Sequence, residues 1–223
     1  MFGSKKPSKG AYLDLFSLLY ELFTVARRDG LMKIESHVET PEASSIFSKY
    51  SSFLENHHAV NFLCDTLKVM VGGGIAPQDL ETLLESELDT HHEEASKPVT
   101  ALTKVGDALP GLGIVAAVLG IIVTMQAVGG PPEEIGHKVA AALVGTFLGI
   151  LLSYGFVSPL ATNMEFLCSF EARYLMCIKE CVLAFARGAT PIVAVEFGRR
   201  VIFSEDRPGY NELEEHCRVA IKK

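Results

Sequence analysis

One cluster of histidine and glutamate side chains has residue types that could bind a metal ion. Residues 91–94 read His-His-Glu-Glu, and Glu87 precedes His91 by about one helical turn. Because adjacent residues on a helix point to different faces, at most two of these side chains could share one ion. His57 and His58 form a similar pair, without the carboxylate arrangement that would indicate catalysis. We therefore expect solvated helix ends, and neither a metal site nor a catalytic residue, at both places.

Motifs for other kinds of chemistry are also missing from the sequence. Cys177 and Cys181 share a helix face, but without a second pair of ligands they are expected to be packing residues. No Gly-rich phosphate loop opens a helix after a strand, and there is no nucleophile elbow. The net charge of -7 at pH 7 disfavours nucleic acid as a partner. We therefore expect no enzyme, no cofactor and no nucleic-acid partner.

Two long uncharged runs determine the expected fold. Residues 108–132 and residues 139–164 contain no Asp, Glu, Lys, Arg or His. About 20 apolar residues, each adding a helical rise of about 1.5 Å, cross a hydrocarbon core of about 30 Å. The sequence therefore predicts two transmembrane helices joined by the loop 133–138. A buried helical hairpin in a soluble protein is the alternative.

Positive charges predict the orientation of this hairpin, because cytoplasmic flanks of transmembrane helices keep the excess of Lys and Arg. Such residues precede the first run and follow the second, at Lys97, Lys104, Arg173, Lys179 and Arg187. The loop has only Lys138, set against two glutamates. We therefore place the loop outside, and residues 1–107 and 165–223 in the cytoplasm.

The flanking segments have helical periodicity. A hydrophobic content of 48% is too low for a chain that lies wholly in a membrane, so part of the chain faces water. The segment AYLDLFSLLYELFTVARR carries an apolar helical stripe, formed by Leu15, Leu18, Leu19, Leu22 and Phe23. Pro77 opens a further helix. The expected fold is an all-α membrane protein, with a transmembrane helical hairpin and a helical cytoplasmic domain.

Small residues recur along one face of each predicted span. In the first span they are Gly113, Ala117, Gly120 and Thr124, and in the second they are Ala141, Gly145, Gly149 and Ser153. Such spacing lets membrane helices approach closely. We therefore expect these faces to pack against helices, including helices outside the hairpin.

The spans lack any ionisable side chain, which constrains the mechanism. An ionisable group inside the membrane is the usual mark of an ion pathway. If this protein helps to move protons, the group that carries them must therefore belong to a partner.

Three segments carry a family resemblance: GDALPGLGIVAAVLG at 106–120, VGTFLGILLSYGFVSPLA at 144–161 and PIVAVEFGRR at 191–200. They resemble hallmark segments of the MotA/TolQ/ExbB proton-channel family. EFGRR and the charged first cytoplasmic helix are similar to the flagellar stator branch of that family. The resemblance covers essentially the whole chain, from AYLDLFSLLYELF to the terminal ELEEH segment.

The resemblance implies a stator subunit of the bacterial flagellar motor in the inner membrane, with the loop 133–138 in the periplasm. Such subunits form a homo-oligomeric ring around MotB-type B subunits, whose transmembrane aspartate carries the proton. Ion flow is then coupled to torque on the rotor protein FliG. The family has four transmembrane helices, and the first two would precede the segment that begins this chain, so the chain is expected to lack them.

The resemblance also assigns roles within the spans. Pro110 matches a proline that couples ion passage to movement of the cytoplasmic domain, and an ordinary helix-start proline is the alternative. Pro159 matches a second proline, where a missing backbone donor makes a kink possible. Thr146 matches a hydroxyl residue on the ion path, and a hydroxyl bonded to its own helix is the alternative. Sodium-driven relatives carry threonine at the position of Ala117, so the expected ion is the proton.

Two charged residues of the cytoplasmic domain gain a role only from the resemblance. Arg27 and Glu35 match the family's rotor-contacting residues, although a charge near a helix end is ordinarily just solvated. Together with EFGRR they weigh against one rival, a TolQ-like or ExbB-like energising subunit for envelope transport. A second rival, a truncated membrane scaffold that conducts no ions, stays open because the chain is expected to lack two of the family's helices.

Overall fold

The computed structural model describes residues 6–126 and 128–222, and all regular elements in these ranges are helical. This confirms the all-α membrane-protein fold. Parts of three predicted segments, namely residues 1–5, residue 127 in the first span and residue 223, lie outside the described residues. The fold divides into two compact units. Residues 1–92 with 169–223 are called the cytoplasmic unit below, after the side of the membrane on which the sequence predicts them, and residues 93–168 are called the membrane unit.

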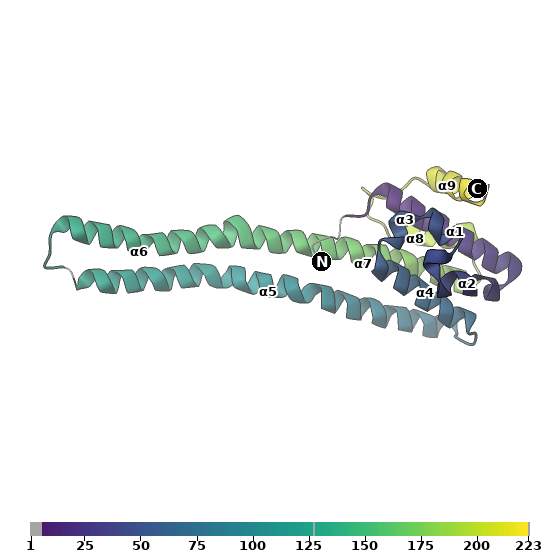
Figure 1. Ribbon diagram of the computed structural model, residues 1–223, viewed down its shortest axis with the longest axis horizontal. Coiled ribbons are helices and arrows are strands. Elements are labelled where there is room, and N and C mark those ends of the chain that lie inside the picture. The colour runs from purple at the N-terminus through teal and green to yellow at the C-terminus, as the bar shows by residue number, and fades with distance from the viewer. Residues whose placement is uncertain (1–5, 127, 223) are drawn as a thin grey trace. The chain divides into compact units, whose positions relative to one another are not determined.

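The cytoplasmic unit contains the short elements of the chain (Figure 1). In order they are α1 (Lys9–Asp29), η1 (Leu31–Ile34), α2 (Glu35–Glu39), η2 (Pro41–Ala43), η3 (Phe47–Lys49), α3 (Ser51–Leu54), α4 (His57–Val71), α8 (Pro191–Arg200) and α9 (Tyr210–Lys222). The first part of α5 (Pro77–Met125) and the last part of α7 (Ser158–Ala186) complete it. Both of these helices continue into the membrane unit.

Helix α1 is the centre of the cytoplasmic core. Its N-cap Ser8 accepts a hydrogen bond from the backbone N–H of Ala11, and Gly30 ends it with a φ of 91°. All five residues of the predicted apolar stripe are fully buried, and α1 packs against α8 and α9. The ring of Phe23 stacks on Phe185 with centroids 4.4 Å apart. Burial of each large apolar side chain contributes about 1.5–3 kcal/mol.

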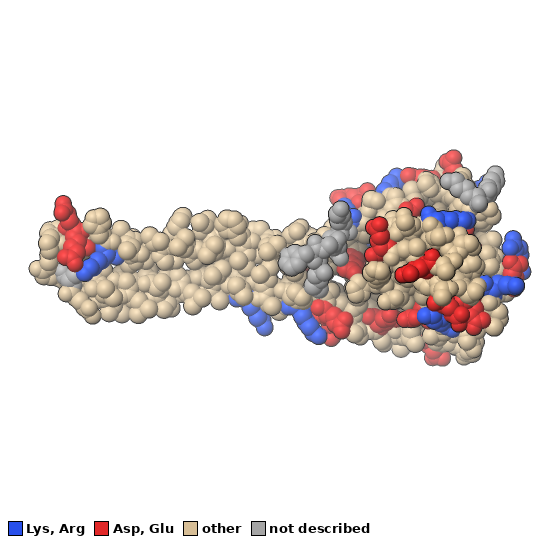
Figure 2. Space-filling view, in the orientation of Figure 1, with Lys and Arg blue, Asp and Glu red and all other residues tan. Residues whose placement is uncertain are grey.

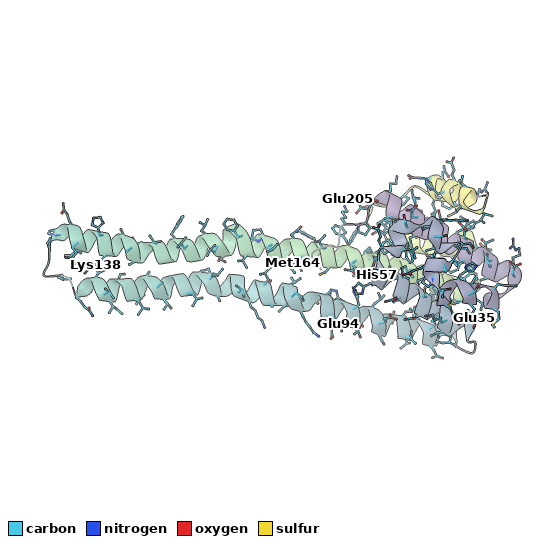
Figure 3. All side chains as sticks on the ribbon, viewed as in Figure 1. Glu35, His57, Glu94, Lys138, Met164 and Glu205 are labelled. Carbon is cyan, nitrogen blue, oxygen red and sulfur yellow. The ribbon has the colours of Figure 1, made fainter. Side chains whose placement is uncertain are left out.

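The membrane unit is an antiparallel helical hairpin (Figure 1). One arm is the part of α5 from residue 93 onward, and the other is the continuous run of α6 (Pro132–Leu152), the π-helical turn η4 (Ser153–Val157) and α7 as far as residue 168. Both arms are long and apolar enough to cross a membrane. In Figure 3 the label Lys138 lies near the turn of the hairpin, and Met164 and Glu94 lie at the opposite end of the unit.

One predicted boundary differs from the structure. Residues 133–138 were expected to form the loop, but they make the first turns of α6, and the chain turns before Pro132. Proline at the first helical position with Glu133 and Glu134 in the first turn is a favourable helix start, which explains the difference. The predicted membrane boundary between residues 107 and 108 stays a prediction, because α5 is one continuous helix of 49 residues there.

The outer faces of the membrane unit are apolar. Figure 2 shows an uncharged surface along this unit between the charged residues at its turn and the next Lys and Arg side chains. Large exposed side chains on it include Ile114, Val118, Ile121, Phe147 and Tyr154. The large residues therefore face outward and the small residues face the contact between the two arms.

Candidate functional site

The two arms of the membrane unit touch through glycines. A Cβ atom at Gly113 would lie 2.8 Å from the carbonyl oxygen of Gly145, and one at Gly149 would lie 2.6 Å from that of Leu109. Gly120 is equally restricted, because its Cβ would lie 2.5 Å from the Cβ of Ala142. Side chains larger than hydrogen at these three positions would force the helices apart.

Ala141 is the one member of the predicted stripes that lies outside the contact between the two arms. Its side chain is exposed, whereas Ala142 is buried against Gly120. A step of four residues drifts by about 40° around a helix of 3.6 residues per turn, so repeated steps of four leave the face. One step of three, from Ala142 to Gly145, keeps the stripe on the contact.

Two hydroxyls of the second arm donate hydrogen bonds to carbonyl oxygens of the first. Thr146 Oγ1 lies 3.3 Å from the oxygen of Gly113, and Ser153 Oγ lies 2.7 Å from that of Gly106. The alternative for Thr146, a bond back to its own helix, is wrong for this structure. That arrangement is found instead at Thr124, whose hydroxyl donates to the carbonyl of Gly120 over 2.8 Å.

The two prolines assigned to coupling lie inside the arms. Pro110 is an interior residue of α5, so the alternative of a helix-start proline is wrong. Pro159 is exposed and is the second residue of α7, which begins directly after η4. Both residues lack a backbone N–H, and each therefore leaves one carbonyl of its helix without the usual donor. Ala117, assigned to the ion path, is buried in the contact between the arms, and its backbone nitrogen lies near Gly145.

One histidine of the cluster at residues 91–94 pairs with a glutamate that is distant in the sequence, so the spacing of residues does not reveal the pair. His91 Nε2 lies 3.6 Å from a carboxylate oxygen of Glu171 on α7, and its ring contacts that of His58 edge-on. The hydrogen bond with His91 lowers the pKa of Glu171 below its ordinary value. Among the described residues, no group of three or more His, Cys, Asp or Glu side chains is arranged to hold a metal ion.

The residues Cys177 and Cys181 lie in the packed contact of α7 with α8. Both are fully buried, and burial raises the pKa of the Cys177 thiol to about 12. Gly198 of α8 sits directly against the sulfur of Cys181. A buried thiol that stays protonated is a poor metal ligand, and these two side chains act as packing residues.

The segment EFGRR forms a clamp at the end of α8. Glu196 accepts hydrogen bonds of 2.6 Å from both Arg199 and Arg200, and Arg199 also donates to the carbonyl of Pro208 over 3.0 Å. Arg199 is buried, and its hydrogen bond holds the pKa of Glu196 below the ordinary value of 4.5. The spacing of three residues between Glu196 and Arg199 is a local signal that could have predicted this pair.

Arg27 and Glu35 lie on consecutive elements of the cytoplasmic unit. Arg27 is exposed in the last turn of α1, and its guanidinium donates to the carbonyl of Ala189 over 3.1 Å. Glu35 is the half-buried first residue of α2, where a negative charge is favoured by the helix dipole. Together with Glu39 and Lys68 it lines an open groove of about 510 Å³ beside α4, and Figure 3 labels its position.

Comparison with known proteins identifies a family whose sequences match this chain. Residues 55–167 match the MotA/TolQ/ExbB proton channel family. Motility protein A of Salmonella typhimurium is 40% identical over 219 residues, which cover 98% of this chain and 74% of the relative.

Two solved structures share the fold. One is the MotAB structure of C. jejuni, with a TM-score of 0.72 and 21% identity, covering 87% of this chain and 69% of that one. The other is the flagellar MotAB stator complex of Bacillus subtilis, with a TM-score of 0.68 and 23% identity, covering 90% and 69%. The uncharged hairpin, its glycine contact and these matches agree, and the chain belongs to the MotA/TolQ/ExbB proton channel family.

Proposed function

We propose that this protein is a stator subunit of the bacterial flagellar motor, which forms part of a proton channel that couples ion flow to rotation. The observation that carries this proposal is the 40% identity with a Motility protein A over 98% of the chain. It distinguishes the stator branch from the envelope-transport branch of the same family. The chain acts by conducting and coupling, and no enzymatic step is assigned to it.

The proton carrier belongs to a partner. Neither predicted span contains an ionisable side chain, although proton relays in membranes depend on such groups. The relatives with the same fold are MotAB complexes, so the partner that fits is a MotB-type B subunit with a transmembrane aspartate. The exposed apolar faces of the membrane unit suit further copies of this chain in a ring, the B subunit and the lipid bilayer.

Within the membrane unit, four residues serve the ion path and its coupling. Pro110 and Pro159 are the points where the arms lose a backbone hydrogen bond and can bend. Thr146 adds a hydroxyl between the arms, and Ala117 offers no oxygen ligand for a dehydrated sodium ion. These features favour the proton as the coupling ion.

The cytoplasmic unit contacts the rotor protein FliG through charged residues. Arg27 is exposed, and Glu35 lines an open groove, so both can reach a partner. Complementary charges at such a surface steer docking and allow rapid exchange rather than give high affinity. The excess of Lys and Arg beside the spans supports a location of this unit on the cytoplasmic side of the inner membrane.

A chimera tests the proposed function. The Salmonella relative keeps the part of its chain that has no match here, and the remainder is replaced by this sequence. We expect the chimera to restore swimming to a flagellated cell that lacks its own A subunit. A chimera that inserts at the normal level but fails to swim, while supporting envelope transport in a cell lacking its TolQ-like or ExbB-like subunit, would contradict the stator assignment.

A further inference from the structure

We propose that Ser153 is a positioning residue for the Pro110 hinge, because its hydroxyl supplies the hydrogen-bond donor that the proline removes from α5. In an α-helix, each carbonyl accepts from the N–H four residues later. The N–H partner of the Gly106 carbonyl would belong to residue 110, which is proline. Ser153 Oγ donates to this same carbonyl over 2.7 Å.

The site is closed to water, so the donor cannot be replaced by solvent. Ser153 is 1% exposed, and Gly106 is also buried. In membrane helices, prolines are tolerated where Ser or Thr side chains satisfy the freed backbone group. The bond between the arms therefore completes the hydrogen bonding of α5 at its hinge.

Local backbone geometry brings the hydroxyl to this carbonyl. Ser153 is the first residue of η4, and its own carbonyl accepts from the N–H of Ser158 in the wider π-helical pattern. Gly106 has no side chain, and a Cβ there would lie 3.3 Å from both Ser158 Oγ and Val157 Cγ1. Single π-helical turns inside α-helices occur frequently at functional sites.

The functional part of this inference rests on the proposed function. A hinge that lacks its own hydrogen bond is held by the second arm, so displacement of either arm at Ser153 is passed to the other at Pro110. Loss of the hydroxyl leaves one α5 carbonyl without a donor, so the hinge is no longer held there. The bond from Thr146 still joins the arms. The expected result is a channel that still conducts protons and delivers less torque.

The bond itself can be tested by carbonyl resonance, independently of motility. Gly106–Asp107 is the single Gly–Asp step of the chain, so carbonyl-13C glycine with 15N aspartate isolates the Gly106 carbonyl in the full-length complex in lipid. We expect Ser153→Ala to move this resonance upfield. In a Pro110→Ala background the same change should have little effect, because an alanine at this position restores the backbone donor.

Thr124→Ala is the matched control for the resonance, since that hydroxyl bonds to its own helix at Gly120. It should leave the Gly106 resonance in place. An unchanged Gly106 resonance in Ser153→Ala would overturn the inference, and so would a shift of equal size in the Pro110→Ala background.

Torque and proton flux separate positioning from simple structural support. Across Ser153→Ala, Ser153→Cys and Ser153→Thr, stall torque should follow the Gly106 resonance while proton flux through the complex is retained. A variant with the wild-type resonance but lost torque, or with equal loss of torque and flux, would overturn the positioning role. If the full-length complex without any substitution drives no rotation, the proposed function fails, and the resonance result still stands by itself.

Discussion

The two units of this protein are built on opposite rules. In the cytoplasmic unit the large side chains are inside, and residues such as Phe16, Leu19 and Phe23 are fully buried. In the membrane unit the large side chains point outward, and glycines with hydroxyl–carbonyl bonds form the contact. The difference follows from the solvent: water drives large apolar groups inward, whereas lipid does not, so close packing and polar bonds hold membrane helices together.

The largest effect expected from this comparison is the removal of a core aromatic ring. Phe23→Ala should destabilise the cytoplasmic unit by about 3–5 kcal/mol, because Phe23 is fully buried and stacks on Phe185. Phe147→Ala is the matched control, since that ring is 63% exposed in the membrane unit. Denaturant unfolding of the purified protein measures both. Equal losses would break the proposed contrast.

In the membrane unit, the destabilising change should be the addition of a side chain at a glycine, whereas in the cytoplasmic unit it is the removal of one. Gly149→Val should cost about 1–3 kcal/mol, because its Cβ would lie 2.6 Å from the backbone oxygen of Leu109. Gly111→Val is the control, since no atom beyond its chain neighbours and the backbone of its own helix lies within 4 Å of its Cβ position. Thermal stability in detergent and disulfide cross-linking between the arms report the change. Full tolerance of Gly149→Val would show that the arms need no close contact.

A smaller, pH-dependent effect belongs to the EFGRR clamp. The pKa of Glu196 is lowered in the folded protein, so its stabilising contribution is complete above pH 4.5 and is lost as pH falls through the folded pKa. Glu196→Gln should therefore cost about 1 kcal/mol at neutral pH, with the difference from wild type shrinking below pH 4.5. Unfolding midpoints at several pH values test this.

Glu214→Gln provides the comparison for that series, because the partner Arg218 is 70% exposed. It should change the unfolding midpoint little at any pH. A difference between wild type and Glu196→Gln that grows toward acid would contradict the sign of the pKa shift.

The smallest effect on stability is expected at the rotor-contact residues, where the effect on function should be clear. Arg27→Glu should reduce torque while leaving insertion and association with the B subunit intact, because an exposed charge contributes at most about 1 kcal/mol to folding. Arg28→Glu makes the same change in charge one residue away, at a side chain paired with Asp29. Equal loss of torque in both variants would indicate that the overall charge of this surface matters, and not a specific contact made by Arg27.

The sequence alone was sufficient to predict the membrane hairpin, because two long uncharged runs indicate directly that these segments lie in lipid and not in water. It misplaced the turn, since Pro132 with two glutamates begins a helix and charge alone suggested a loop. Ala141 lies outside the contact between the arms because steps of four drift around a helix, and its packing against a helix outside the hairpin stays a prediction. The next residue, Ala142, restores the pattern and could have been found by allowing a step of three.

Other features depend on contacts between distant segments and had no local signal. His91 meets Glu171 across 80 positions of the sequence, and Ser153 reaches Gly106 only because η4 and a side-chain-free glycine bring them together. Arg27 and Glu35 were found through resemblance alone, and their rotor role stays a prediction. Prediction of the bond from Ser153 to the carbonyl freed by Pro110 would need the register of one arm against the other. Hydrophobic periodicity does not determine that register.

We propose that this hairpin, which has no ionisable group in its spans, serves a proton-driven motor whose proton carrier lies on a partner. Rotation of cells that carry the full-length protein provides the decisive test. We expect rotation to persist in sodium-free medium and to stop when a protonophore dissipates the proton gradient. Rotation speed that follows external sodium at a constant proton gradient would contradict it.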